Sequence, residues 1–565
     1  MSTTRLNPTR ENAADIVLLN GKVITVNPEN VVAEAVAIKG NRILSVGKTD
    51  EIKRLVYSNT KTIELEGRAV LPGFIDAHAH LEDHAANLTY PLRVFVPPLK
   101  SVKDILKKIE ERAAKTTKGE WILALGGGHF GHRVEEKRYV TKTELDQIAP
   151  DNPVVLDAGF HQAIVNSKAL EAFGITKDTP RYLKDPDGGW TVFVYKDPST
   201  GEPTGKLGEP HWLFYPFTYK LRTHDEVKEA MRKVMMSAFI EQGITTIHEI
   251  SGPKALKAYQ EFLTNNELPL RVRFYIDVKE MQMYGLDIDD LTRLGLQSGF
   301  GNEWLKLGGI KLFADGGSPN AAIYEPSAFD VHYFGLLHRT QEELNRIYVE
   351  ALKVGLQVIT HTVGEKAQDM VLNAIQAALY ELPKKDHRYR LEHAGNYFAT
   401  PERMQRMLEL GAIPVTTPQF LSSIGPLLEG FYGKRISKLG LYPYKMLLDM
   451  GFKLPFSSDC TGVSLKEPNP FYGIWLSVTR KTPDGTVVEA SQRISVMDAI
   501  RCYTINAAYA GFEENVKGSI EPGKLADLIV VSKNPLSIPV DEIRDLKVEM
   551  TIIDGKIVYK SEDAP

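Results

Sequence analysis

The central part of the sequence alternates short apolar runs with amphipathic stretches, and this alternation limits the fold more than any other feature. Runs rich in β-branched residues are typical of buried strands, while residues 224–243, 340–355 and 365–382 have the period of a helix. Strand–helix alternation predicts parallel strands joined by right-handed crossovers. The runs that predict strands are residues 74–80, 243–250, 270–278, 305–317, 355–364, 389–395, 412–419 and 453–460.

About eight strand–helix units predict a closed (β/α)8 barrel, the TIM barrel of the α/β class. The structural alternative is an open, doubly wound sheet. That alternative is disfavoured because no GxGxxG motif begins a helix after the first strand. The glycines of LALGGGHFGH lack the required spacing, and we interpret them as part of a loop.

Both ends of the chain have the pattern of β-hairpins. Asn20-Gly21 and Asp554-Gly555 separate β-branched runs, and such dipeptides favour tight hairpin turns. Neither end holds enough strands to close a sandwich alone. We therefore expect residues 1–72 and 516–565 to combine into one small β-sandwich, with the barrel spanning residues 73–515.

Residues 85–223 interrupt the strand–helix alternation after the first barrel strand. The segment KDPDGGWTVFVYKDPSTGEPTG, rich in turn residues, predicts an irregular lobe with a hairpin. Insertions after barrel strands lie at the C-terminal face, where TIM-barrel active sites occur. We expect a lid or substrate lobe, in which His129, His132 and Trp190 are interpreted as packing or polar contacts.

Composition and charge exclude several classes of function. The formal net charge of −4 gives no basic surface for nucleic acid or an anionic membrane. Two cysteines rule out a disulfide scaffold and favour a reducing compartment. We see no apolar signal segment and no membrane-spanning run. The expectation is a cytoplasmic protein with a small-molecule substrate; a homodimer is left open.

Two histidines stand at the end of the first predicted barrel strand. Residues two apart on a strand project to the same face, so His78 and His80 should point the same way. Two converging imidazoles form half of a site for a zinc-type ion. Alone, they are equally explained as two hydrogen-bonded histidines at a strand end.

Other predicted strands end in residues of the same chemical kind. His361, His393 and Asp459 end the fifth, sixth and eighth runs, and the fourth run carries Lys311 and Asp315. All strands of a parallel barrel end at one rim, so these side chains can converge. Each alone could be a capping aspartate or a hydrogen-bonded histidine. Together they predict a site for a divalent metal.

Lys311 is unusual because it lies within an apolar strand. Burial lowers the pKa of a lysine and exposes a nucleophilic amine. Such an amine can react with carbon dioxide to give an anionic carbamate, which could bridge two ions about 3.5–4 Å apart. The alternative is an ion pair between Lys311 and Asp315 or Glu392.

The combined motifs PGFIDAHAH, IKLFADGG, THTVGEKA, RLEHAG, FSSDC and GSIEPGKLADLIVV resemble the amidohydrolase superfamily. More closely the sequence resembles the YtcJ-like, amidohydrolase-3 branch, which includes N-substituted formamide deformylases. The resemblance runs from roughly Ala14 to Tyr559. It implies a composite β-sandwich and an inserted lobe, in agreement with the patterns above.

The resemblance also implies metal ligands. His78 and His80 would hold one ion with Asp459, and two further histidines a second ion. We expect zinc, with manganese and iron as alternatives, and two ions if Lys311 is carbamylated. The complete implied set is His78, His80, Lys311, His361, His393 and Asp459.

The implied reaction is attack of a metal-activated hydroxide on the carbonyl of a C–N amide-type bond, either N-acyl, N-formyl or cyclic. Asp459 would act as general base and then as general acid. The resemblance of the segment DAGFHQAIVNSKAL implies that His161 contacts the substrate or the developing oxyanion. We expect Asp315 to bind the substrate together with His161.

Two other functions compete with amide hydrolysis. The same site could act on an ester or lactone, or catalyse a non-hydrolytic lyase reaction. A regulatory protein on an inactive scaffold is disfavoured because every expected ligand type is present. Aromatic residues in rim loops indicate either a partly aromatic pocket or packing; these residues are Tyr324, Phe329, Tyr333, Phe334 and Phe471.

Overall fold

The computed structural model describes residues 13–89, 92–185, 190–210, 212–214, 223–278, 286–384, 386–461 and 468–565. At its centre, seven parallel strands lie in the order β8-β16-β17-β18-β19-β20-β21. This arrangement confirms the predicted TIM barrel. The strands are Phe74–Ala79 (β8), Ile244–Ser251 (β16), Arg271–Asp277 (β17), Leu305–Phe313 (β18), Gln357–His361 (β19), Arg390–Glu392 (β20) and Ile413–Val415 (β21).

The eighth predicted run fills the gap between β21 and β8 without forming a regular strand. The amide of Ala77 in β8 donates to the carbonyl oxygen of Phe456 at 3.2 Å, and Phe456 forms a parallel bridge with Thr416. The amide of Ser458 donates instead to the side chain of Asp76 at 2.9 Å. This side-chain contact interrupts the backbone ladder while the segment still completes the ring.

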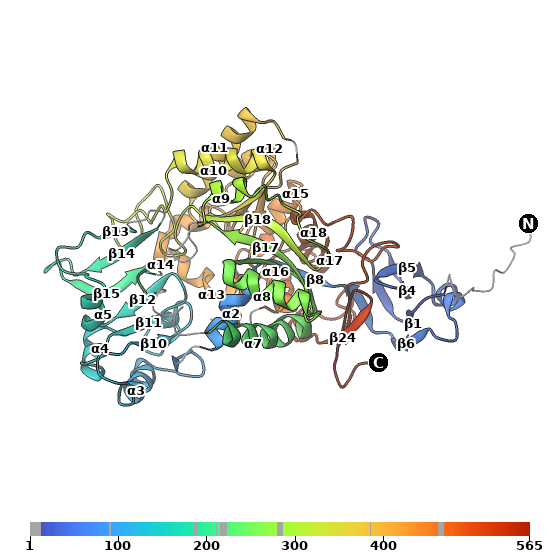
Figure 1. Cartoon of the computed structure of the whole chain (residues 1–565), viewed down its shortest axis with the longest axis horizontal. Helices are drawn as coiled ribbons and strands as arrows, with labels where there is room; N and C mark the ends of the chain where they lie inside the picture. Colours follow the sequence, from blue (N-terminus) through green and yellow to red (C-terminus); the bar gives the residue numbers. More distant parts are fainter. Residues whose placement is uncertain are drawn as a thin grey trace, which may run out of the picture.

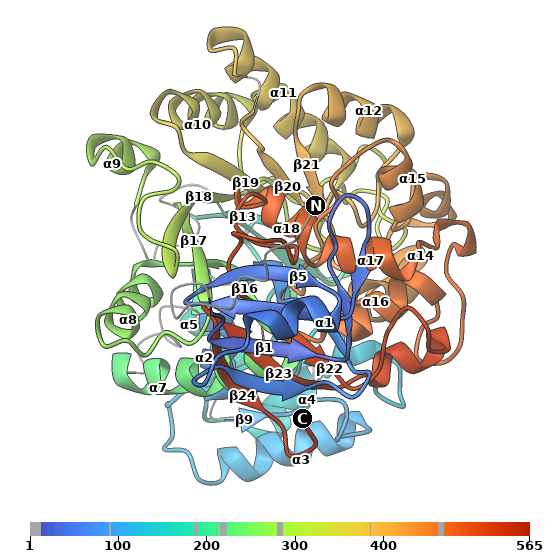
Figure 2. The same ribbon diagram turned by 90° about the vertical axis from the view of Figure 1, so that its right-hand side faces the viewer.

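Helices surround the barrel strands (Figure 2). The helix Gln341–Val354 (α10) shows how the sequence sets the two ends of such a helix. The side chain of Thr340 accepts from the amide of Glu343 at its start, and Gly355 ends it with φ 78°. The helices after the lobe are His224–Val234 (α7), Pro253–Thr264 (α8), Ile288–Arg293 (α9), Gln341–Val354 (α10), Glu365–Glu381 (α11), Pro401–Glu409 (α12), Phe420–Ser423 (α13), Leu428–Tyr432 (α14), Tyr444–Asp449 (α15), Pro470–Thr479 (α16), Val496–Cys502 (α17) and Ile505–Ala510 (α18).

Strands from both ends of the chain share a six-stranded sheet, in which β7 and β22 pair antiparallel with Leu71 opposite Ile529. A four-stranded sheet packs against it through apolar side chains such as Leu18 and Val530. The domain boundaries at residues 72 and 516 stay predictions. The two sheets contain Ile16–Leu19 (β1), Ala35–Lys39 (β4), Arg42–Gly47 (β5) and Lys61–Glu64 (β6), and Lys22–Ile24 (β2), Val32–Ala33 (β3), Ala69–Pro72 (β7), Leu528–Val531 (β22), Val548–Ile553 (β23) and Lys556–Lys560 (β24).

The inserted lobe is more regular than the sequence predicts. Its described residues hold a seven-stranded mixed sheet and helices that include Val102–Ala113 (α3), Lys142–Ile148 (α4) and Ser167–Ala172 (α5). Its strands have at most six residues, too short for a clear periodic signal. Residues 186–189, within the segment that predicts a hairpin, lie outside the described part. The strands are Leu92–Arg93 (β9), Ile122–Leu125 (β10), Val154–Asp157 (β11), Gln162–Val165 (β12), Tyr182–Lys184 (β13), Thr191–Lys196 (β14) and Pro203–Gly208 (β15).

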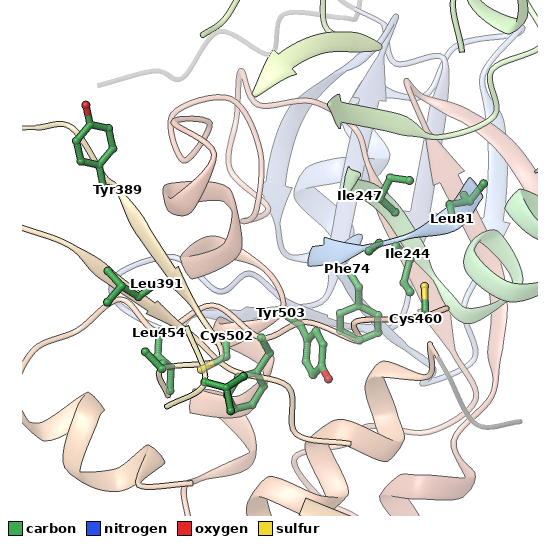
Figure 3. Packing of buried hydrophobic residues seen from close by; sticks show 14 of the residues in the cluster. Phe74, Leu81, Ile244, Ile247, Tyr389, Leu391, Leu454, Cys460, Cys502 and Tyr503 are labelled. Carbon is green, nitrogen blue, oxygen red and sulfur yellow. The ribbon is translucent and has the colours of Figure 1, made fainter. Parts of the chain in front are cut away.

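The lobe and the sandwich lie at opposite ends of the barrel (Figure 1). Between them, the apolar core connects barrel strands and helices. Phe74 packs edge-on against Phe471, with ring centroids 5.2 Å apart. It also packs against Tyr503, with centroids 6.1 Å apart, and these two rings are labelled in Figure 3. Among the described residues, no helix has both the length and the apolar character needed to cross a membrane. The lobe faces the carboxyl ends of the barrel strands.

Candidate metal centre

His78 and His80 point to the same side of β8, as their spacing predicts. Their Nε2 atoms lie 3.2 Å apart, and each lies 3.3 Å from Oδ1 of Asp459. Ligand atoms about 2.0–2.1 Å from a tetrahedral ion are separated by about 3.3 Å. The three side chains therefore already have the spacing that a zinc-type ion requires.

The other ring nitrogens of these histidines have their own acceptors. Nδ1 of His78 lies 2.5 Å from Oε2 of Glu392, and Nδ1 of His80 lies 3.2 Å from the carbonyl oxygen of Ile250. A proton on each Nδ1 satisfies these contacts and leaves the Nε2 lone pairs directed at the cluster. This arrangement of an outer partner behind each histidine is common in metal sites.

Glu392 is held by Arg390, two residues before it on β20. The guanidinium of Arg390 contacts both carboxylate oxygens of Glu392, at 2.8 and 3.0 Å. Burial by itself would raise the pKa of Glu392, but Arg390 and His78 outweigh burial and lower it. The carboxylate therefore stays anionic and accepts the Nδ1 proton of His78.

His361, at the end of β19, and His393, after β20, face the same pocket with ring centroids 4.7 Å apart. Burial lowers the pKa of His393 to about 3 and that of His361 well below its ordinary value. Nε2 of His361 and Nδ1 of His393 are buried and have no hydrogen-bond partner among the described residues. Neutral, unsatisfied imidazole nitrogens fit a second cation position.

Asp459 lies between the two histidine pairs. Its Oδ1 approaches His78 and His80, while Oδ2 lies 3.9 Å from Nε2 of His393. Burial would raise the pKa of Asp459, but the surrounding imidazoles, His78 first, lower it well below its ordinary value. Asp459 has φ 52°, a left-handed backbone conformation that aims its side chain into the pocket.

Lys311 lies in the same pocket and is fully buried in β18. Its Nζ atom is 4.5 Å from the ring centroid of Phe313, two residues along the strand. The carboxylates considered as ion-pair partners have other contacts: Asp315 accepts three backbone amides, and Glu392 binds Arg390 and His78.

His161 reaches the pocket from the lobe, between β11 and β12. Its ring centroid is 5.7 Å from that of His361. Its Nδ1 atom lies 3.0 and 3.1 Å from the two oxygens of Glu209. Burial would lower the pKa of His161, but the Glu209 carboxylate outweighs burial and raises it.

A protein-family model named Amidohydrolase family matches residues 61–559. The chain belongs to the amidohydrolase family. It is 30% identical to an N-substituted formamide deformylase from Arthrobacter pascens over 97% of this chain and 98% of the relative. It is 29% identical to the putative amidohydrolase YtcJ of Bacillus subtilis (strain 168), over 96% of this chain and 98% of that protein.

A solved structure shows the same architecture. The crystal structure of an uncharacterized metal-dependent hydrolase from Pyrococcus furiosus aligns with a TM-score of 0.67 and 25% identity, covering 92% of this chain and all of that chain. Family and fold together show that this chain is a metal-dependent hydrolase. Its residues His78, His80 and Asp459 have the spacing to hold a metal.

The pocket of this amidohydrolase has a cavity volume of about 100 Å³. The apolar part of its lining includes three aromatic residues, Phe160, Phe313 and Phe420, and the aliphatic residue Ile424. His129 also lines the pocket, and its ring packs against Phe431 with centroids 5.6 Å apart, so its interpretation as a packing or polar residue stays a prediction. None of the five rim aromatics singled out by sequence lines this pocket, so for these residues the packing or surface interpretation is favoured.

Asp315 lies outside the pocket lining. Its carboxylate accepts hydrogen bonds from the amides of Val363, Ala322 and Gly364 at 2.7–2.9 Å. Burial raises the pKa of Asp315 to about 8. These contacts tie the loop after β18 to the loop after β19, so Asp315 shapes the rim, and its predicted contact with substrate stays untested.

Proposed function

We propose that this amidohydrolase cleaves the C–N amide-type bond of a small N-acyl, N-formyl or cyclic amide, with zinc as its metal. The observation that carries the proposal is the position of Asp459 between His78 and His80 on one side and His393 on the other. The similarity to an N-substituted formamide deformylase supports an amide substrate.

The proposed chemistry needs a bound divalent ion, which would polarise the substrate carbonyl and lower the pKa of a water molecule toward 7. Asp459 accepts a proton from the attacking water and donates it to the leaving nitrogen. Its position 3.3 Å from His78 and His80 and 3.9 Å from His393 suits this transfer. His161, across the pocket, contacts the substrate carbonyl or the charge that develops there.

We further propose that Lys311 is carbamylated and that the site then holds two ions. The amine of Lys311 forms a bond to the carbon of carbon dioxide and loses one proton, which gives an anionic carbamate. Lys311 lies close enough to His361 and His393 for its charge to contribute to lowering the pKa of both. A carbamate here would offer two oxygens beside these neutral histidines.

A substrate panel tests the proposed function. Metal-free and zinc-loaded protein would be assayed with N-formyl, N-acyl and cyclic amides, and with ester and lactone analogues of the same substituents. Hydrolysis of at least one amide, lost with a chelator and restored by zinc, is expected. Activity on esters or lactones with none on any amide would contradict the proposal and favour the alternative function.

A further inference from the structure

Glu209 is a buried carboxylate behind the pocket, directly after β15, and no sequence motif points to it. It has no exposed surface and a φ of 52°, an uncommon conformation for glutamate. Its amide donates to the carbonyl oxygen of His161 at 3.0 Å, and its side chain returns to Nδ1 of the same residue. Backbone and side chain of Glu209 therefore both bind His161.

Other donors fix the rotation of the Glu209 carboxylate. Oε1 accepts from the amide of Gly317 at 3.1 Å and from Nδ2 of Asn320 at 2.9 Å. The hydroxyl of Tyr333 in turn donates to Oδ1 of Asn320 at 2.9 Å, which fixes the amide orientation of Asn320. Oε1 also lies 3.1 Å from Nδ1 of His161, but two other donors already bind it, so Oε2, at 3.0 Å, is the oxygen that is free to accept from Nδ1.

The loop after β18 packs closely against this pair. A Cβ atom at Gly317 would lie 2.4 Å from Nε2 of His161, and one at Gly316 would lie 2.8 Å from Oε1 of Glu209. Only glycine lets the backbone pass at this distance. The glycines of the FADGG motif thus hold the ring of His161 in one orientation.

We propose that Glu209 is a positioning residue, which holds the proton of His161 on Nδ1 and thereby presents Nε2 to the substrate. The amide of Gly317 lies 3.3 Å from Nδ1 of His161 and 3.1 Å from Oε1 of Glu209. Because the carboxylate of Glu209 only accepts, Nδ1 donates to Glu209 and the Gly317 amide donates to Oε1, so Nε2 is the nitrogen available to the pocket. This inference rests on the proposed function, since it assigns His161 to the substrate side of the reaction.

Glu209→Gln is the informative change. Because Oε1 must accept from Gly317 and Asn320, the amide nitrogen of glutamine takes the place of Oε2 and donates to Nδ1 of His161. The proton of His161 then moves to Nε2, as an acid-to-amide change beside a catalytic histidine is known to enforce. We expect kcat to fall about 10–100-fold, the range for partners that orient active-site histidines, with little change in KM.

A double-mutant cycle separates positioning from a purely structural role. If Glu209 acts through His161, Glu209→Gln has no further effect on kcat in a His161→Ala background. Glu144→Gln is the matched control, because Glu144 is a lobe carboxylate that binds Arg138 and does not line the pocket. An unchanged kcat in Glu209→Gln, or an equal loss with and without His161, would overturn the proposal.

A readout that does not depend on activity distinguishes failure of this inference from failure of the proposed function. Nitrogen NMR of protein with labelled histidine reports which ring nitrogen of His161 carries the proton, with His161→Ala assigning the signal. We expect protonated Nδ1 in the wild type and a shift to Nε2 in Glu209→Gln. The same tautomer in both proteins would refute the role of Glu209, even if amide hydrolysis is found.

Discussion

Glu392 accepts the Nδ1 proton of His78 across 2.5 Å, and this contact determines which nitrogen of His78 faces the metal centre. Arg390 holds the carboxylate from the other side. His78 and the pair that orients it are thus contributed by two strands, β8 and β20, that are far apart in the sequence.

Replacing Glu392 by glutamine should weaken metal binding. The glutamine amide can donate to Nδ1 and favour the wrong tautomer, so we expect metal affinity to fall about 10–100-fold. Competition with a coloured chelator measures this affinity. Glu549→Gln is the control, because Glu549 is also buried and paired with an arginine, Arg68, but lies in the sandwich. Equal affinities in Glu392→Gln and wild type would exclude an orienting role.

The purified protein should contain one to two equivalents of a divalent transition metal. The close spacing of His78, His80 and Asp459 and the unsatisfied nitrogens of His361 and His393 are the physical reason. Elemental analysis measures the content. Metal-free protein with full activity would contradict a metal-dependent reaction.

Asp459→Asn should keep the fold but lower kcat by about 10²–10⁴, the range for loss of a general acid–base group. Circular dichroism checks the fold and steady-state kinetics checks kcat. Asp369→Asn serves as control, because Asp369 pairs with Arg403 and does not line the pocket. Turnover equal to wild type would remove Asp459 from the proton transfer.

Lys311→Met should reduce the bound metal from two equivalents to one. Methionine fills a similar volume but cannot form a carbamate, so the bridge between the two proposed positions is lost. Metal titration gives the stoichiometry, and electron density at Lys311 in a crystal of the wild type reveals the modification directly. An unmodified amine that contacts no metal would rule out the bridge.

Asp527→Asn should destabilise the protein through the contact between barrel and sandwich. Asp527 receives two hydrogen bonds from the buried guanidinium of Arg271, at 2.7 and 3.0 Å. Removing one partner of a buried pair leaves the charge of the other uncompensated. Because Asp554 still lies 3.1 Å from the guanidinium of Arg271, we expect the free energy of unfolding to fall by about 3 kcal/mol, the low end for such pairs. Urea unfolding measures this loss.

The control for this experiment is Asp449→Asn, which breaks an exposed pair with Lys445 on α15. Exposed pairs contribute about 0.2–1 kcal/mol. A change in Asp527→Asn no larger than in this control would show that the Arg271 contact does not stabilise the domain junction.

The sequence allows the barrel and the ligand cluster to be predicted because both follow local rules. His78, His361 and His393 each stand where an apolar run ends. The parallel strands of a barrel bring their carboxyl ends to one rim, and this does not depend on the conformation of the loops. The eighth strand was expected to be regular. Its irregularity depends on Asp76 binding Ser458, a contact between opposite ends of the barrel sequence that no local pattern reveals.

The supporting residues could not be predicted for the same reason. Glu209 is one acidic residue among many until folding brings His161 beside it. Arg390 and Glu392 did leave a signal, since two charged residues at alternate positions of a buried strand require partners. The aromatic pocket residues were missed because Phe420 and Phe160 come from segments that follow no strand–helix rule.

The pairing of β7 with β22 bears on how the chain is made. β7 leaves the ribosome long before its partner β22, because several hundred residues separate the two strands in the sequence. At 5–20 residues per second, the edge of β7 waits roughly 20–90 seconds for β22. An unpaired apolar edge invites association with other chains. Truncation of the final strands should therefore produce aggregated protein even though every proposed metal ligand is present.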